Sequence, residues 1–280
     1  MHKIITTEQG KIEFCAYGSG TPLLFVHGGH SNCKESLFHK GFDTSRFMLV
    51  TPSRPGYGQT PLLPDHSPKH TAGLFIALLN ELHIERAIVI GISAGGPTAI
   101  EIAATYPARV DKLILISAVT QKWMHETDVN YRRGKKLFNP SIERWSWALF
   151  RFFYFLFPRF MAKIMCRELS SAKNGTLHTD EVKELHDMIR KQRSHRGFVS
   201  DLDQDIPAET VAAVSCPTLI MHSLNDAVVH IDHARFALEH IKNSVLMTYD
   251  NHWGHLLWLG RESERPIADA ISFIEKSQSP

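Results

Sequence analysis

One short stretch constrains the fold of this chain more than any other. Residues 87–106 read AIVIGISAGGPTAIEIAATY. The first four are apolar, as in a buried strand, and the residues after Gly-Ile-Ser-Ala-Gly at 91–95 are the small apolar ones of a buried helix. A strand that turns this sharply into a helix needs very small residues two before and two after the serine of the turn. The pattern therefore predicts that Ser93 is a nucleophile on a strained strand-to-helix turn.

A serine hydroxyl is a poor nucleophile at neutral pH and needs a base. After a turn of this kind, the acid and the histidine follow the serine in chain order. Asp226 follows an apolar run in PTLIMHSLNDAVV, and His255 follows the last such run in NHWGHLLWL, directly after Gly254. We expect His255 to take the proton of Ser93, while Asp226 holds the histidine tautomer and stabilises the imidazolium.

Two other residues compete for these roles. His252 lies three residues before His255, and Asp250 also ends a predicted strand. We expect His252 at the surface or in a supporting position. The run KLILISAV at 112–119, which contains the sixth predicted strand, leads into Thr120 and is not followed by an acidic residue. It therefore offers no competitor to Asp226 for the role of the acid.

A second glycine turn predicts the groups that would stabilise an oxyanion. The segment LLFVHGG at 23–29 is an apolar strand that runs into two glycines. Two backbone amides are the usual stabiliser of a tetrahedral intermediate, and one of them belongs to the residue after the nucleophile, here Ala94. We expect Gly29 to supply the second amide and His27 to brace the loop by hydrogen bonding.

The remaining apolar runs alternate with helical patterns. The predicted strands are 3–7, 11–17, 23–27, 47–51, 87–91, 112–117, 217–222 and 244–249, and the predicted helices are 70–82, 94–106, 231–241 and 267–276. The first two strands alternate polar and apolar residues and suit an antiparallel edge, whereas runs such as AIVIG suit strands covered on both faces. This order predicts an α/β fold with a doubly wound, mostly parallel sheet flanked by helices.

The alternation is interrupted between the sixth and seventh predicted strands. Residues 121–205 contain no convincing strand, and they carry 16 Lys/Arg against 11 Asp/Glu, or +5, in a chain whose net charge is +2. We predict that 121–205 is a helical cap inserted into a core formed by 1–120 and 206–280. The acidic residues Asp201, Asp203 and Asp205, where the cap returns to the core, are expected to be a solvated linker.

The predicted cap contains an aromatic segment, WSWALFRFFYFLFPRF at 145–160, in which nine of 16 residues are aromatic. A helix that is apolar nearly all round must be covered on most sides. Three interpretations remain open: a cap helix that lines an apolar pocket, a partner or dimer interface, and a membrane-surface contact aided by nearby basic residues. The first predicts the substrate-binding residues Trp123, Trp147, Phe150, Phe153 and Trp253.

Composition excludes several other classes of protein. A net charge of +2 and a pI of about 8.3 do not support nucleic-acid binding. The four cysteines form no C-x-x-C pair, and no histidine pair has convincing metal-ligand spacing, so we expect no metal. The first residues, MHKIITTEQGKIEF, lack the apolar core of a secretory signal, and the expected compartment is the cytoplasm.

Together these features resemble the α/β-hydrolase fold family, particularly its capped esterase and lipase-like members. The matching pieces are VHGG at 26–29, SRPGYGQT at 53–60, GISAGG at 91–96, SLNDAVV at 223–229 and GHLLWLG at 254–260. The resemblance implies an eight-stranded sheet with an antiparallel second strand, a cap after the sixth strand, a triad of Ser93, Asp226 and His255, and no metal or organic cofactor. His30 departs from the family, where proline or glycine often stands.

The nucleophile narrows the expected reaction. Relatives that cleave carbon–halogen bonds or epoxides have aspartate where this chain has Ser93. We therefore expect a cofactor-free serine hydrolase that cleaves small to medium apolar carboxylic esters through an acyl-enzyme. The same triad would also serve C–C bond, thioester or amide hydrolysis or perhydrolysis, and a slow-turnover ligand receptor is the alternative outside catalysis. No oligomeric state follows from the sequence.

Overall fold

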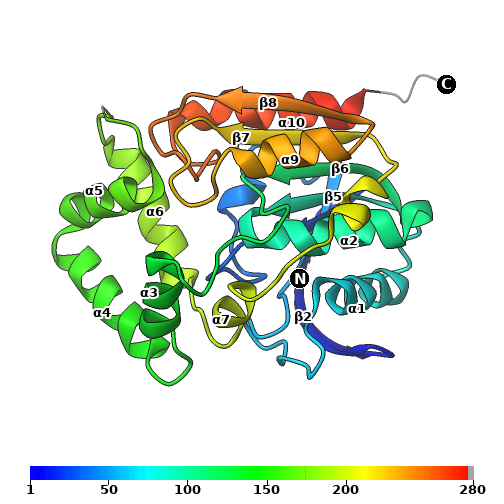
Figure 1. The fold of residues 1–280 in the computed structure, drawn as a ribbon, viewed down its shortest axis with the longest axis horizontal. Helices are drawn as coiled ribbons and strands as arrows, with labels where there is room; N and C mark the ends of the chain where they lie inside the picture. The colour runs from blue at the N-terminus through cyan, green and yellow to red at the C-terminus, as the bar shows by residue number, and fades with distance from the viewer. Residues whose placement is uncertain (174, 277–280) are drawn as a thin grey trace.

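The computed structural model describes residues 1–173 and 175–276. Its centre is an eight-stranded sheet with the order β1-β2-β4-β3-β5-β6-β7-β8 (Figure 1). The strand β2 pairs antiparallel with β1 and β4, and the other pairs are parallel, which confirms the predicted sheet. The strands are β1 His2–Thr7, β2 Gly10–Tyr17, β3 Thr21–Val26, β4 Phe47–Pro52, β5 Ala87–Ile92, β6 Val110–Ile116, β7 Thr218–Ser223 and β8 Ser244–Tyr249.

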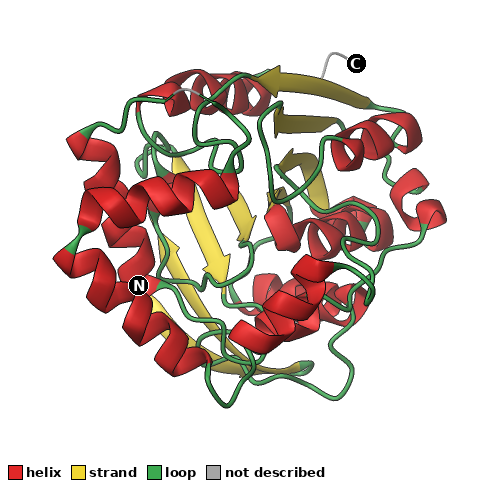
Figure 2. Ribbon diagram, turned by 60° about the vertical axis from the view of Figure 1, so that its left-hand side comes forward, coloured by secondary structure: helices red, strands yellow, loops and turns green. Residues whose placement is uncertain are grey.

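Helices cover both faces of this sheet (Figure 2). Alternate side chains of β3 point to opposite faces of the sheet. Leu24 and Val26 belong to a buried cluster that includes residues of α1, α2 and α9, whereas Leu23 and Phe25 belong to a second cluster on the other face. These flanking helices are α1 Pro68–Glu81, α2 Gly96–Thr105, α9 Asp232–His240 and α10 Glu264–Glu275. They agree with the four helices predicted from the sequence to within a few residues at each end.

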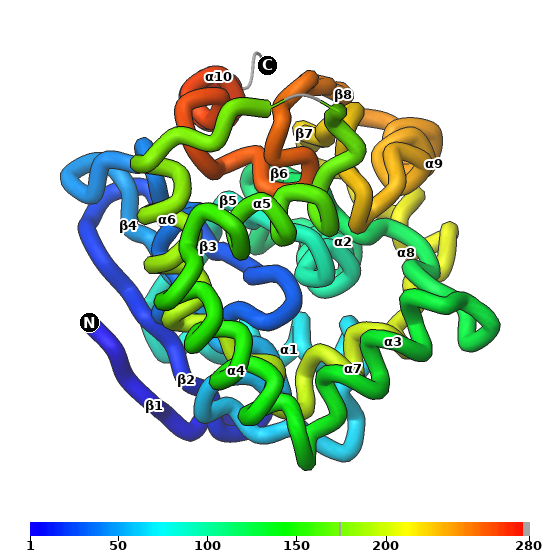
Figure 3. The backbone as a smooth tube through the Cα atoms, turned by 90° about the vertical axis from the view of Figure 1, so that its left-hand side faces the viewer, coloured from blue at the N-terminus to red at the C-terminus, as the bar shows by residue number. Residues whose placement is uncertain are grey.

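The chain between β6 and β7 is helical. It forms α3 Val129–Leu137, α4 Glu143–Leu156, α5 Pro158–Leu169, α6 Thr179–Lys191, α7 Gly197–Asp201 and α8 Ala208–Ala212. Figure 1 shows α3 to α6 beyond the end of the sheet toward which the β8 arrow points, and Figure 3 looks onto this side, with α4 and α5 in front. The proposed division of the chain at 121 and 205 stays a prediction.

None of the helices in the described residues is both long and apolar enough to cross a membrane.

Candidate active site

Ser93 lies at the turn between β5 and α2, and its backbone is strained there. Its φ is +50°, a value that costs a residue with a side chain about 1–3 kcal/mol. A Cβ on Gly91 would lie 2.6 Å from the Cβ of Ala99, and one on Gly95 would lie 2.2 Å from the carbonyl oxygen of Val26. The two glycines are therefore required by close contacts, as the sequence predicts.

The three residues predicted to act together meet at the carboxyl ends of three parallel strands. Ser93 follows β5, Asp226 follows β7 and His255 follows β8. The Oγ of Ser93 lies 2.9 Å from Nε2 of His255, and Nδ1 of His255 lies 2.8 Å from Oδ2 of Asp226. Because an ionised carboxylate only accepts, Nδ1 carries the proton and Nε2 is free to accept from the serine hydroxyl. All three residues are buried.

Asp226 is held as a carboxylate by its neighbours. Its Oδ1 accepts hydrogen bonds from the amides of Val228 and Val229 at 2.8 and 2.9 Å. Burial acts to raise the pKa of Asp226, but the charge and hydrogen bond of His255 and the Val229 amide hold it below its usual range. Nε2 of His222 also lies 3.5 Å from Oδ2. The carboxylate is therefore ionised at neutral pH and can stabilise an imidazolium.

Neither alternative residue reaches Ser93. The Nδ1 of His252 lies 2.9 Å from a carboxylate oxygen of Glu262, and Asp250 accepts a hydrogen bond from the side chain of Asn225. His255 is the histidine that contacts the serine, and the half-buried His252 pairs with carboxylates outside the triad.

With this geometry in place, the comparisons with known proteins decide the family. The model of the α/β hydrolase fold matches residues 21–261. The chain belongs to the α/β hydrolase family. It is 38% identical over 277 residues to the uncharacterized hydrolase YcgS of Bacillus subtilis (strain 168), and the match covers 97% of each protein. The resemblance inferred from the sequence motifs is confirmed.

Two solved structures share the fold of this α/β hydrolase. One is an α/β hydrolase fold protein from Nakamurella multipartita, with a TM-score of 0.78 and 21% identity over 98% of each chain. The other is the esterase EaEST from Exiguobacterium antarcticum, with a TM-score of 0.75 and 20% identity over 99% of this chain and 100% of that one. At such identities the likeness concerns the fold.

The glycine loop after β3 approaches the nucleophile closely. A Cβ on Gly28 would lie 3.0 Å from the Cβ of Ser93. Among the described residues, the amide of Gly29 donates to no acceptor, and that of Ala94 donates to none outside its own helical turn. The role of these two amides in stabilising an oxyanion stays a prediction.

His27 braces this loop in the predicted manner. Its Nε2 accepts a hydrogen bond of 3.0 Å from the backbone amide of Arg54, so Nδ1 carries the proton and donates to the carbonyl of Gly28 at 2.8 Å. Burial places the pKa of His27 well below its usual range, and the ring is therefore neutral. A neutral, tautomer-fixed ring keeps the loop in one conformation.

Asp201 was expected in a solvated linker, and this expectation is wrong. The residue ends α7 and is 4% exposed, and its carboxylate accepts hydrogen bonds from both terminal nitrogens of Arg54 and from the hydroxyl of Tyr57. The Nε of Arg54 also donates to the carbonyl of His27 at 2.8 Å. The network joins α7 to the glycine loop. Arg54 and Tyr57 belong to the motif SRPGYGQT, and this motif is the sequence signal that could have revealed the network.

The predicted substrate-binding aromatics occupy different environments. Trp147 is buried and packs against the half-buried Phe150, Trp123 is half-buried against Phe198, and Trp253 is wholly buried in the core. Phe153, in contrast, lies on the exposed face of α4, where its ring contacts Phe152. We therefore withdraw Phe153 from the predicted pocket, and the roles of the other four stay predictions.

His30, which departs from the family pattern, connects the glycine loop to the inserted helices. Its ring stacks on Phe198 with centroids 3.9 Å apart and packs edge-on against Trp147. The indole nitrogen of Trp147 donates to Ser194 Oγ at 2.7 Å, and Ser194 Oγ shares a second hydrogen bond of 2.8 Å with Nδ1 of His30. Ser194 therefore links the ring of His30 to the indole of Trp147.

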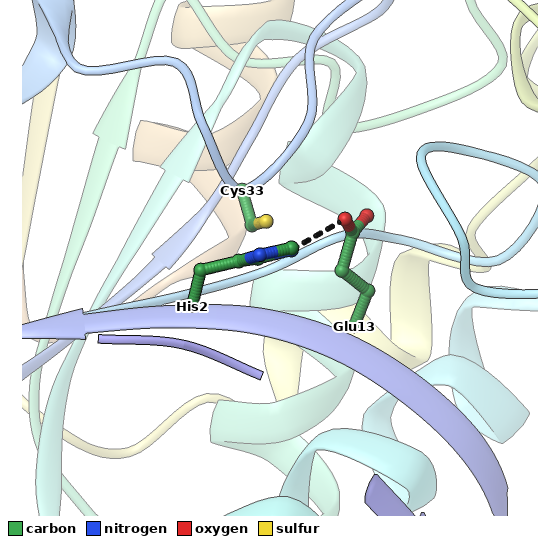
Figure 4. A group of neighbouring side chains, drawn as sticks. All are labelled: His2, Glu13 and Cys33. Carbon is green, nitrogen blue, oxygen red and sulfur yellow. Dashed lines mark hydrogen bonds and ion pairs between the residues drawn. The ribbon is translucent and has the colours of Figure 1, made fainter. Parts of the chain in front are cut away.

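One group of possible metal ligands lies away from the triad. Ligand atoms of His2, Glu13 and Cys33 all lie within 4.8 Å of one another (Figure 4). The Glu13 carboxylate, however, accepts hydrogen bonds from His2 and from Ser53 Oγ and lies 3.6 Å from the Lys34 ammonium. Because these groups already occupy both carboxylate oxygens, we assign the group to hydrogen bonding within the fold rather than to a metal.

Proposed function

We propose that this α/β hydrolase is a serine esterase that cleaves small to medium apolar carboxylic esters. The observation that carries the proposal is the continuous hydrogen-bond chain from Ser93 Oγ through His255 to Asp226, with distances of 2.9 and 2.8 Å. Such a chain converts a weakly nucleophilic hydroxyl into one that attacks a carbonyl carbon.

The first half of the reaction acylates the serine. Ser93 Oγ attacks the ester carbonyl as its proton passes to Nε2 of His255, and the carboxylate of Asp226 stabilises the resulting imidazolium. The amides of Gly29 and Ala94 stabilise the negative oxygen of the tetrahedral intermediate. The intermediate collapses when Nε2 gives its proton to the departing alkoxide, which leaves as the alcohol.

The second half returns the enzyme to its starting state. Water takes the place of the alcohol and loses a proton to Nε2 of His255 as its oxygen attacks the acyl carbon. The second tetrahedral intermediate expels Ser93 Oγ, which recovers the proton from His255. The acid is released, and each proton taken up by the histidine has been given back.

The substrate class follows from the rings around the glycine loop. Phe198 packs against Gly29, and the neutral ring of the next residue, His30, contacts Phe198, Phe138 and Trp147. A site with aromatic walls binds by burial and separates substrates by size. We expect kcat/KM to rise about three- to fourfold for each added methylene until the acyl chain fills the space.

The test combines covalent labelling with a graded substrate panel. A fluorophosphonate should label Ser93, and Ser93→Ala should lose both the label and the hydrolysis of p-nitrophenyl esters. Ser117→Ala is the matched control, because Ser117 is also a buried serine with positive φ, and its Oγ has no hydrogen-bond partner among the described residues. Ser117→Ala should behave as the wild type.

Three outcomes would contradict the proposal. A label that persists in Ser93→Ala would exclude this nucleophile. Labelling of Ser93 with turnover only of thioesters, amides or ketones would change the bond that is cleaved. Labelling without multiple turnover on any of these would indicate a ligand receptor.

A further inference from the structure

The outer side of the inserted helices exposes an unusual amount of apolar surface. Twelve of the 18 exposed large hydrophobic residues of the described chain lie between 129 and 164. Trp145 and Phe155 are 73% and 75% exposed. Soluble proteins rarely leave large apolar patches open, and such patches mark interaction sites. This finding contradicts the sequence expectation that the aromatic helix is covered on most sides.

The exposed residues share one side of α4 and α5. The side chains of α4 that face inward are Glu143, Trp147 and Tyr154, spaced so that they form a single stripe. The outward face, here called the aromatic face, consists of Trp145, Leu149, Phe152, Phe153, Phe155, Leu156, Phe157, Phe160 and Ile164. Figures 1 and 3 show α4 and α5 at the outer edge of the molecule, so none of the described elements covers this face.

The charges beside the aromatic face are mainly positive. Residues 144–167 contain five Arg or Lys and no Asp or Glu, and the exposed Glu168 near the end of α5 is paired with Arg133. Arg144, Lys163 and Arg167 are exposed and have no hydrogen-bond or ion-pair partner among the described residues. Free cations beside exposed aromatic and aliphatic side chains are the composition of helices that lie in the interface of an anionic membrane.

We propose that the aromatic face docks onto the surface of an anionic phospholipid bilayer, with α4 and α5 lying in the interface plane. The aromatic rings enter the boundary between headgroups and acyl chains, where such rings are favoured, and the basic side chains contact lipid phosphates. The long stems of Arg and Lys bury apolar surface and keep their charges in water.

A second copy of the chain fits this face less well. A symmetric dimer would set the same patch against itself, so the basic residues of the two copies would oppose each other without an acidic partner from 144–167. Like charges opposed across an interface are unfavourable, whereas phosphate headgroups supply the missing negative charge. Charge complementarity therefore selects the bilayer.

Helix α5 is also connected to the candidate active site by backbone hydrogen bonds. Leu169 ends α5, and its carbonyl accepts hydrogen bonds from the backbone amides of His255 at 3.0 Å and Ala227 at 3.2 Å. The aromatic face itself contains no residue of the triad, so docking and ester hydrolysis can be tested separately.

The test is flotation of the full-length protein with vesicles of phosphatidylcholine alone or with about 30% phosphatidylglycerol. We expect the protein to float with the anionic vesicles at about 0.1 M salt and to be released at about 1 M. Phe155→Ser/Phe160→Ser and Arg144→Glu/Lys163→Glu should each lower binding at least about tenfold. Emission from Trp145 should shift to the blue on binding, and Trp145→Phe should lose the shift.

Two controls separate docking from other effects. Leu238→Ser/Val245→Ser removes two exposed apolar residues outside the inserted helices and should float as the wild type does. Ser93→Ala should also float. Phe155→Ser/Phe160→Ser and Arg144→Glu/Lys163→Glu should both keep their hydrolysis of a water-soluble ester. Failure of the wild type to float with anionic vesicles would overturn the proposal. So would equal loss of binding in the Leu238→Ser/Val245→Ser control, or a dimer in light scattering that Phe155→Ser/Phe160→Ser dissociates.

Discussion

Arg54 and Asp201 form an ion pair through two hydrogen bonds of 2.7 Å, and each side chain is only 2% exposed. Removing one partner of a buried pair leaves the other charge uncompensated and costs about 3–5 kcal/mol. We therefore expect Arg54→Met to lower the free energy of unfolding by about that amount, measured by chemical denaturation. Activity should fall as well, because the Nε of Arg54 also donates a hydrogen bond to the carbonyl of His27 in the glycine loop.

The exposed pair between Arg133 and Glu168 is the control for this prediction. Arg133→Met should leave the unfolding midpoint unchanged, because exposed pairs contribute little. The double variant Arg54→Met/Asp201→Leu should regain part of the lost stability, since it removes both buried charges. An Arg54→Met variant as stable as the wild type would show that the pair does not hold α7 against the core.

The histidine that contacts Ser93 can be told from its neighbour by activity. His255→Ala should lower kcat at least about a thousandfold, whereas His252→Ala should have a small effect, since its ring contacts carboxylates. Asp226→Asn should also lose about a thousandfold or more, because the amide favours the wrong tautomer. Equal losses in His252→Ala and His255→Ala would contradict this assignment.

The pH profile tests the same site. The lowered pKa of Asp226 means that its carboxylate takes up a proton at a lower pH than an ordinary aspartate does. The acidic limb of kcat/KM should therefore contain no protonation of this carboxylate above about pH 4. A step in that range that disappears in Asp226→Asn would show that Asp226 titrates there.

Much of the site could be predicted because its signals are local. Ser93, Gly91 and Gly95 lie in one turn with close steric limits, and Asp226 and His255 follow strands that the apolar runs make visible. The partner of Asp201 could not be predicted, because Arg54 lies 147 residues away in the sequence. In addition, three acidic residues close together are more typical of a solvent-exposed loop. Only the fold brings the two together.

The exposure of the aromatic helix could also not be predicted from the sequence. The apolar side chains of 145–160 indicate that the helix is covered. They do not indicate whether the cover is another part of the same chain, a partner or a membrane. Trp147 and Trp145 have the same side chain two residues apart, yet one is buried and the other exposed. The orientation of α4 on α6 decides which side faces outward, and this is a property of tertiary packing.

Buried histidines should make the protein sensitive to acid. Burial lowers the pKa of His30 to about 3 and those of His39 and His233 to about 4, and it places that of His27 well below the usual value of 6.5. These rings are neutral in the folded protein but bind protons in the unfolded chain as the pH falls below 6.5. Their contribution to stability is therefore complete above pH 6.5 and is lost as the pH falls toward 4.

Two carboxyl groups act in the opposite direction. Burial raises the pKa of Glu35 and Glu101, so the folded protein takes up protons there first. With four histidines against two carboxyls, we expect unfolding between pH 6.5 and 5 to take up more than one proton. The free energy of unfolding should then fall by at least ~1.4 kcal/mol per pH unit. His39→Gln should reduce this slope and the exposed His230→Gln should not; a flat profile would contradict the prediction.

The hydrogen-bond chain from Trp147 through Ser194 to His30 predicts a defined tautomer. The indole N–H of Trp147 can only donate, and among the described residues the Ser194 hydroxyl has no acceptor for its own proton other than Nδ1 of His30, so we expect it to donate there. The ¹⁵N chemical shifts of His30 should show a protonated Nε2 and an unprotonated Nδ1 across neutral pH.

Ser194→Ala breaks this chain at its centre. The indole nitrogen of Trp147 is then left buried without an acceptor, which costs about 1–3 kcal/mol of stability, and His30 loses the bond that selects its tautomer. The control is Ser200→Ala, since Ser200 is also buried but its Oγ has no hydrogen-bond partner among the described residues. It should unfold at the wild-type midpoint. A protonated Nδ1 in the wild type, or equal losses in the two variants, would show that Ser194 does not orient His30.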